Sequence, residues 1–155
     1  MRLAASLALA FATGLVVSPL AQRALPGAQA QAQSQAAPLA PMVIDIAALK
    51  DADLAATPNP DLRSKALVTT DNATLAVQTG NVAKHFHARS DEIQYIVEGS
   101  GSAWLGDRRI ELRPGLLIII PKGTAHAGTE ATNGRFKALA IKIPPQVAGD
   151  TTLVD

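Results

Sequence analysis

Short runs in which apolar and polar residues alternate fill the chain between residues 63 and 143. In residues 92–98, for example, isoleucine, tyrosine and valine alternate with mostly polar positions. Because the side chains of a strand point alternately to its two faces, this period of two predicts β-structure rather than helix. The predicted strands cover residues 66–70, 74–79, 84–88, 92–98, 102–105, 108–113, 116–120, 125–129 and 136–143.

Turn-forming residues separate these strands and indicate the kind of fold. Residues 71–72 and 106–107 predict tight hairpins, whereas residues 99–101 and 132–134 are expected to turn the chain. Residues 116–120 form a continuous apolar run between prolines, which predicts a strand buried on both faces. Many short strands joined by glycine- and proline-containing turns predict an all-β sandwich or barrel.

The first 30 residues have the order of an export signal. Arg2 gives a positive start, residues 3–17 are uncharged and largely apolar, and small residues follow Pro19. The apolar run is short for a membrane span. We expect residues 1–30 to be a signal peptide that is cleaved between residues 21 and 32; an uncleaved anchor and a buried helix are the alternatives. The mature protein is then periplasmic or secreted, with no stable membrane insertion after processing.

Segments with weaker patterns flank the predicted strands. Residues 31–41 are rich in alanine, glutamine and proline, which predicts a flexible segment. Residues 42–65 are expected to cover the domain or to lie at its edge, and residues 146–155 to form a C-terminal tail. Within the cover segment, residues 43–46 predict a short strand that could pair with a second subunit in a homodimer, and residues 46–55 a turn or two of helix.

Composition narrows the functional classes. The 155 residues carry a net charge of +1, and 48% of them are hydrophobic, as expected of one globular domain. Because the chain has no large excess of positive charge, it is not expected to bind nucleic acid. It contains no cysteine, which excludes disulfides, thiolate metal ligands and cysteine nucleophiles.

The chain's three histidines gather in two short pieces, His85-Phe86-His87 and a later segment that contains His126. On a strand, His85 and His87 point to the same face. Glu92 adds an anionic oxygen a few residues later. Three imidazoles and one carboxylate suit one divalent transition-metal ion, namely Mn, Fe, Co, Ni, Cu or Zn.

These residues lie in two motifs that resemble those of the cupin family. The spacing of the opening glycine is one residue shorter than is usual in the family, and Glu130 stands where the family usually has asparagine. Neither departure changes one of the four side chains named above. The matching positions are Gly80, His85, His87, Glu92 and Gly99 in the first motif, and Gly115, Pro121, Gly123 and His126 in the second.

The resemblance implies an all-β domain over residues 66–145, a double-stranded β-helix or jelly-roll barrel with the ion inside it. It assigns His85, His87, Glu92 and His126 as the metal ligands. Four protein ligands on an ion that prefers six leave two positions for water, dioxygen or substrate. Gln94 and Ile96 share the face of Glu92 and are expected to line the pocket. Gln94 is the candidate for orienting a ligand or binding substrate, and Glu92 and Gln94 are the candidate catalytic residues.

Two functions remain open at this point. The first is a small-molecule metalloenzyme of the dioxygenase, isomerase or lyase type, all of which the resemblance allows. The second is a non-catalytic module that binds a small ligand or the metal itself. An aromatic or acidic pocket would favour the enzyme, whereas a purely apolar pocket around the ion would favour the binding module.

Overall fold

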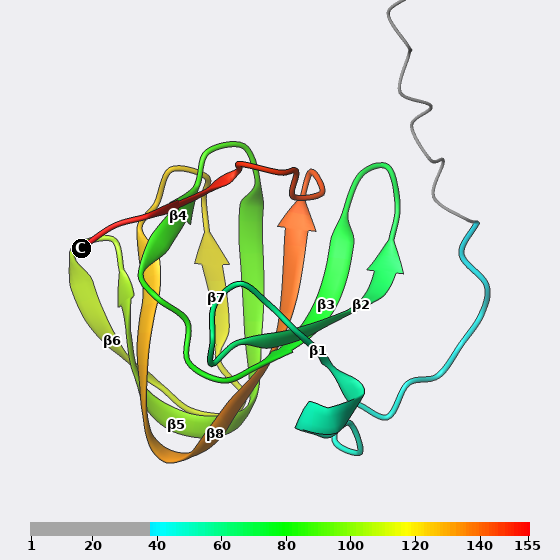
Figure 1. Ribbon diagram of the computed structural model, residues 1–155, viewed down its shortest axis with the longest axis horizontal. Coiled ribbons are helices and arrows are strands. Elements are labelled where there is room, and N and C mark those ends of the chain that lie inside the picture. Colours follow the sequence, from blue (N-terminus) through cyan, green and yellow to red (C-terminus); the bar gives the residue numbers. More distant parts are fainter. Residues whose placement is uncertain (1–37) are drawn as a thin grey trace, which may run out of the picture. The chain divides into compact units, whose positions relative to one another are not determined.

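The computed structural model describes residues 38–155 of the chain. The predicted signal peptide and residues 31–37 of the predicted flexible segment lie outside the described residues. Within residues 38–155 the chain forms nine strands and one short 3₁₀-helix (Figure 1). The elements are η1 Asp51–Asp53, β1 Ala55–Ala56, β2 Arg63–Thr69, β3 Thr74–Thr79, β4 His85–His87, β5 Asp91–Leu105, β6 Arg108–Leu112, β7 Leu117–Ile120, β8 His126–Ile143 and β9 Thr151–Leu153.

The prediction of an all-β fold is confirmed. Every strand pair among the described residues is antiparallel. One path through the sheet runs β1-β2-β3-β8-β4-β9, and β5 also pairs with β6, β7 and β8. Figure 1 shows the sheet curling, and β4 pairs with the start of β8. The curl places one face of the sheet around an interior.

The two longest strands, β5 and β8, continue through places where turns were predicted. β5 passes through residues 99–101, and β8 through residues 132–134. The register between them shifts repeatedly around Glu98 and Ser100, so that the strands bend instead of ending. Gly101 is required here, because a Cβ atom on it would lie 2.0 Å from the Glu130 carbonyl oxygen.

The hydrophobic core corrects two predictions about side-chain burial. Ile96 packs in the core instead of lining the pocket: it keeps the face of Glu92 and Gln94 but lies farther along β5, among the core residues of the interior. Leu117 and Ile119 are 62% and 58% exposed, so the prediction that this strand is buried on both faces is wrong. β7 pairs with β5 alone, and its outward face has no layer above it among the described residues. The buried core residues are Ile96, Ala103, Leu112, Ile118, Ile120 and Phe136.

The segment before β2 contains no strand at residues 43–46 and only the three-residue helix η1 in the region predicted to be helical. Buried Lys137 holds this segment: its Nζ donates to the Ala47 carbonyl oxygen at 3.2 Å and contacts Glu98 Oε1 at 2.8 Å. The homodimer expected from an edge strand here stays a prediction. Within residues 38–155, no helix has both the length and the apolar character needed to cross a membrane.

Candidate metal centre

Neighbouring strands bring the predicted ligand side chains together. His85 and His87 alternate with Phe86 on β4, and both imidazoles are buried, at 7% and 2% exposure. His85 is the direct cross-strand partner of His126, the first residue of β8. Glu92 enters from the start of β5 and is 1% exposed. The period of two that was read from the sequence therefore places both β4 histidines on one face.

The four side chains converge on one point. Their ligand atoms all lie within 4.8 Å of one another. Glu92 Oε2 lies 3.0 Å from His87 Nε2 and 3.2 Å from His126 Nε2. Two atoms that each bind an ion at about 2.1 Å and subtend a right angle are about 3.0 Å apart, so these spacings fit a shared first-row metal ion. His87 Nε2 is buried without an aligned hydrogen-bond partner, as expected of a ligand atom whose partner is an ion.

Backbone carbonyls orient two of the imidazoles. His85 Nδ1 lies 2.8 Å from the Ala83 carbonyl oxygen, and His126 Nδ1 lies 2.9 Å from that of Thr124. A carbonyl oxygen only accepts, so Nδ1 carries the hydrogen and Nε2 keeps its lone pair. The Nε2 atoms thus present the form of histidine that binds metals.

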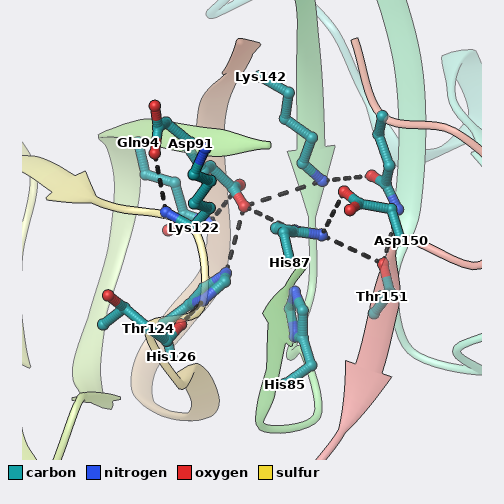
Figure 2. Close-up of polar contacts among 12 residues, drawn as sticks. His85, His87, Asp91, Gln94, Lys122, Thr124, His126, Lys142, Asp150 and Thr151 are labelled. Carbon is teal, nitrogen blue, oxygen red and sulfur yellow. Dashed lines mark hydrogen bonds and ion pairs between the residues drawn. The ribbon is translucent and has the colours of Figure 1, made fainter. Parts of the chain in front are cut away.

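The third imidazole is supported by a carboxylate that sequence reasoning missed. The Thr151 hydroxyl oxygen is hydrogen-bonded to His87 Nδ1 at 3.3 Å, and Asp150 Oδ2 lies 3.4 Å from the same atom, close but without an aligned hydrogen bond (Figure 2). Asp150 is 1% exposed, and its Oδ1 accepts the Arg89 backbone N–H at 2.6 Å. A carboxylate behind a metal-binding histidine fixes the ring and raises its basicity.

This support comes from residues 146–155, which were predicted to be a tail. Instead, β9 pairs with β4 along its whole length, with Thr151 opposite His87. Figure 1 shows the C-terminal segment, in red, running beside β4. Asp150 belongs to no motif and lies 61 residues from Arg89, its hydrogen-bond partner, so no local pattern pointed to it.

Two further side chains contact Glu92. Gln94, the predicted orienting residue, donates from Nε2 to Glu92 Oε1 at 2.8 Å. Lys142 on β8 is the cross-strand partner of Glu92, and its Nζ lies 3.8 Å from Glu92 Oε2 (Figure 2). Lys142 was predicted to lie in a strand, but its pairing with Glu92 is a matter of register that the sequence did not reveal.

Burial and charge adjust the protonation of the cluster. Burial lowers the pKa of His85 from its ordinary 6.5 to about 4, against the opposing hydrogen bond to Ala83. His85 is therefore neutral at pH 7 and free to bind a metal. Burial raises the pKa of Glu92, but contacts with His126 and His87 and the charge of Lys142 outweigh it, so that the pKa lies well below its ordinary value. Burial lowers the pKa of Lys142.

Comparison with known proteins identifies the family. A family model described as a cupin domain matches residues 72–142, a span that contains all four converging side chains. These residues form a cupin domain. One curated relative, the uncharacterized protein MJ1618 of Methanocaldococcus jannaschii, is 35% identical over 71 residues, which are 46% of this chain. The match spans 57% of that relative's length.

Solved structures confirm the double-stranded β-helix fold of the cupin domain. An uncharacterized conserved protein with a double-stranded β-helix domain from Klebsiella pneumoniae has a TM-score of 0.59 at 13% identity, covering 75% of this chain and 99% of that one. KdgF from Halomonas sp. has a TM-score of 0.53 at 21% identity, covering 59% and 87%. Pac13, a nucleoside dehydratase, has a TM-score of 0.53 at 17% identity, covering 68% and 88%. At these identities the likeness concerns the fold alone.

A cavity of about 580 Å³ opens onto the converging side chains of the cupin domain. His85, His87 and Glu92 line it, whereas His126 is buried behind them. Its lining is neither acidic, aromatic nor purely apolar: Glu92 and Lys142 are the charged side chains, and neutral hydrogen-bonding groups lie among apolar residues such as Leu62, Val82 and Leu153. Those neutral groups are Thr57, Asn59, Ser64, Gln78, Gln94, Gln146 and Thr151.

Proposed function

We propose that this cupin domain is a small-molecule metalloenzyme of the isomerase or lyase type. Its ion would be one divalent transition metal, bound through His85, His87, Glu92 and His126. The observation that carries the proposal is the opening of this cluster onto the cavity, which three of the four side chains line. A closed structural site would have no such access for a substrate.

The donor set fits Mn, Fe, Co, Ni, Cu or Zn, since imidazole nitrogen and carboxylate oxygen suit these ions. When bound, such an ion acts as a Lewis acid that polarises an oxygen atom of the substrate. The protein's own groups do the rest. Gln94 holds the Glu92 carboxylate at 2.8 Å, and Asp150 and Thr151 hold His87, so that the ligands stay aimed at one point.

The polar part of the cavity lining supports Lewis-acid chemistry on a compound that carries oxygen atoms. Its neutral amide and hydroxyl groups can hydrogen-bond a substrate rich in oxygen, and beyond the histidines none of the lining residues is aromatic. The likeness to Pac13, a nucleoside dehydratase, supports an elimination reaction as one that this fold accommodates.

The metal content of the purified protein tests the site directly. We expect one ion per chain in the wild type and loss of the ion in His126→Ala, because that substitution removes a buried donor. Glu111→Gln on the exposed side of β6 is the matched control and should retain the ion. Equal metal content in the wild type and His126→Ala, or none in either after reloading at neutral pH, would refute the four-residue site.

Catalysis is tested next, on the metal-loaded protein. We expect metal-dependent isomerisation or dehydration of at least one member of a panel of hydroxy acids, oxo acids, sugars and nucleosides, followed by NMR. Binding of panel members without turnover would favour the non-catalytic binding module instead.

We also propose that the protein is exported, with residues 1–30 as the signal peptide. The order of charge, apolar run and small residues in the sequence supports this. Expression of the full chain in a bacterial host should yield a mature protein outside the cytoplasm whose first residue lies between positions 22 and 33. An intact N-terminus in the cytoplasmic fraction would contradict it.

A further inference from the structure

One oxygen atom of the candidate centre lies close to three nitrogen atoms. Glu92 Oε2 lies 3.0 Å from His87 Nε2, 3.2 Å from His126 Nε2 and 3.8 Å from Lys142 Nζ. The Lys142 side chain is 13% exposed, lines the cavity and donates from Nζ to Gln146 Oε1 at 2.6 Å. Its ammonium therefore points into the same enclosed space as the ligand atoms (Figure 2).

Charge in this space is unbalanced once a divalent ion is present. The carboxylates that face Lys142 are Glu92, at the ligand cluster, and Asp150, behind His87. Together they offset two of the three positive charges that the ion and the ammonium bring, and one positive charge remains. An uncompensated charge in a buried site is costly, so a monoanionic ligand is favoured there.

We propose that Lys142 forms an anion-binding subsite for a small carboxylic acid that carries an oxygen on the neighbouring carbon. This inference rests on the proposed metal-dependent function and names its substrate class. The short distance between Lys142 Nζ and Glu92 Oε2 lets one compound place its carboxylate at the ammonium and its second oxygen at the ligand cluster. The cavity of about 580 Å³ admits such a molecule.

Neutral side chains around the cavity complete the recognition of a hydroxylated acid. Gln78, Gln94 and Gln146 reach the cavity from three different segments and offer amide groups to further hydroxyls. Because Gln146 already accepts from Lys142 and donates to Thr151 Oγ1 at 2.6 Å, the ammonium is held in place before a ligand arrives.

The test is titration calorimetry on the zinc-loaded protein, since zinc adds no redox chemistry. The probes are glycolate, lactate and gluconate, each beside its neutral amide. The variants are Lys142→Met, which removes the charge, and Lys142→Arg, which keeps it. Lys65→Met is the control, an exposed lysine on β2 outside the cavity.

We expect at least one acid to bind the wild type and to bind Lys142→Met about tenfold more weakly, the usual worth of a hydrogen bond to a charged group. The neutral amide of that acid should bind Lys142→Met as tightly as it binds the wild type. The affinity of the acid for Lys142→Arg and for Lys65→Met should stay near its affinity for the wild type. Zinc should remain at one ion per chain in Lys142→Met, because removing a cation beside the ion does not weaken its binding.

The possible failures can be told apart. If zinc binds but no acid does, or if acid affinity in Lys142→Met stays within twofold of the wild type, the subsite is refuted and the metal site stands. If the wild type holds neither zinc nor another of the six candidate ions after reloading, the proposed function fails, and this inference fails with it.

Discussion

Replacing Asp150 with asparagine tests whether the carboxylate behind His87 supports metal binding. Asparagine keeps an oxygen to accept the Arg89 backbone N–H, which Asp150 Oδ1 accepts at 2.6 Å. Its amide nitrogen would take the place of Oδ2, 3.4 Å from His87 Nδ1. An amide N–H there cannot accept from Nδ1–H, so the ring is driven to carry its hydrogen on Nε2, the atom that faces Glu92.

We expect Asp150→Asn to weaken metal binding about 10- to 100-fold, the range typical of lost carboxylate support behind a metal-binding histidine. Thr151 Oγ1, which lies 3.3 Å from the same nitrogen, limits the loss. The assay is competition for zinc against a chromogenic chelator, with thermal melting of the metal-free protein to confirm folding. Asp107→Asn, at an exposed turn, makes the same chemical change away from the site. A zinc affinity within twofold of the wild type would refute the positioning role.

Two more predictions concern stability, measured by urea unfolding of metal-free protein. Because the folded pKa of His85 is about 4 and the unfolded value is near 6.5, the unfolded chain takes up the proton first as pH falls. The free energy of unfolding of the wild type should thus fall by about 3 kcal/mol between pH 6.5 and pH 4. His85→Gln should lack this fall, and an equal dependence of stability on pH in the two proteins would contradict the prediction. Gly101→Ala, whose Cβ would meet the Glu130 carbonyl oxygen at 2.0 Å, should cost about 3 kcal/mol. Gly106→Ala, with nothing within 4 Å of its Cβ, should cost about 1 kcal/mol; equal costs would argue against a steric cause.

The parts of the metal centre that could be predicted are those formed by residues close together in the sequence. His85 and His87 are two residues apart on a strand, so their shared face follows from the pleat alone. Glu92 and Gln94 follow the same rule on the next strand, and the structure places Gln94 beside Glu92 as expected. His126 lies 34 residues from Glu92, and only the resemblance between motifs connected them.

The contacts that escaped prediction depend on pairing between distant strands. Lys142 meets Glu92 because of the register between β8 and β5, and Asp150 meets His87 because β9 folds back onto β4. Neither register is encoded in a short pattern. The sequence also did not show that the strands bend at residues 99–101 and 132–134 instead of ending there, because glycine permits a strand to kink as readily as to end.

Residues 117–120 show a limit of reading burial from composition. A continuous apolar run predicts a strand covered on both sides, yet Leu117 and Ile119 point outward and are exposed. Only the inward positions, Ile118 and Ile120, join the core. Hydrophobicity alone cannot report whether another layer of the protein lies above a strand.

The pairing of β9 with β4 has a consequence for when the centre can be completed during synthesis. Thr151 contacts His87 across 64 residues of sequence, and Asp150 stands directly before it. Proteins emerge from the ribosome N-terminus first. Until residues 150–153 have emerged, this edge of β4 lacks its neighbouring strand, and His87 lacks the carboxylate behind it. The centre is therefore expected to bind its ion more weakly until this segment has been made and has paired with β4.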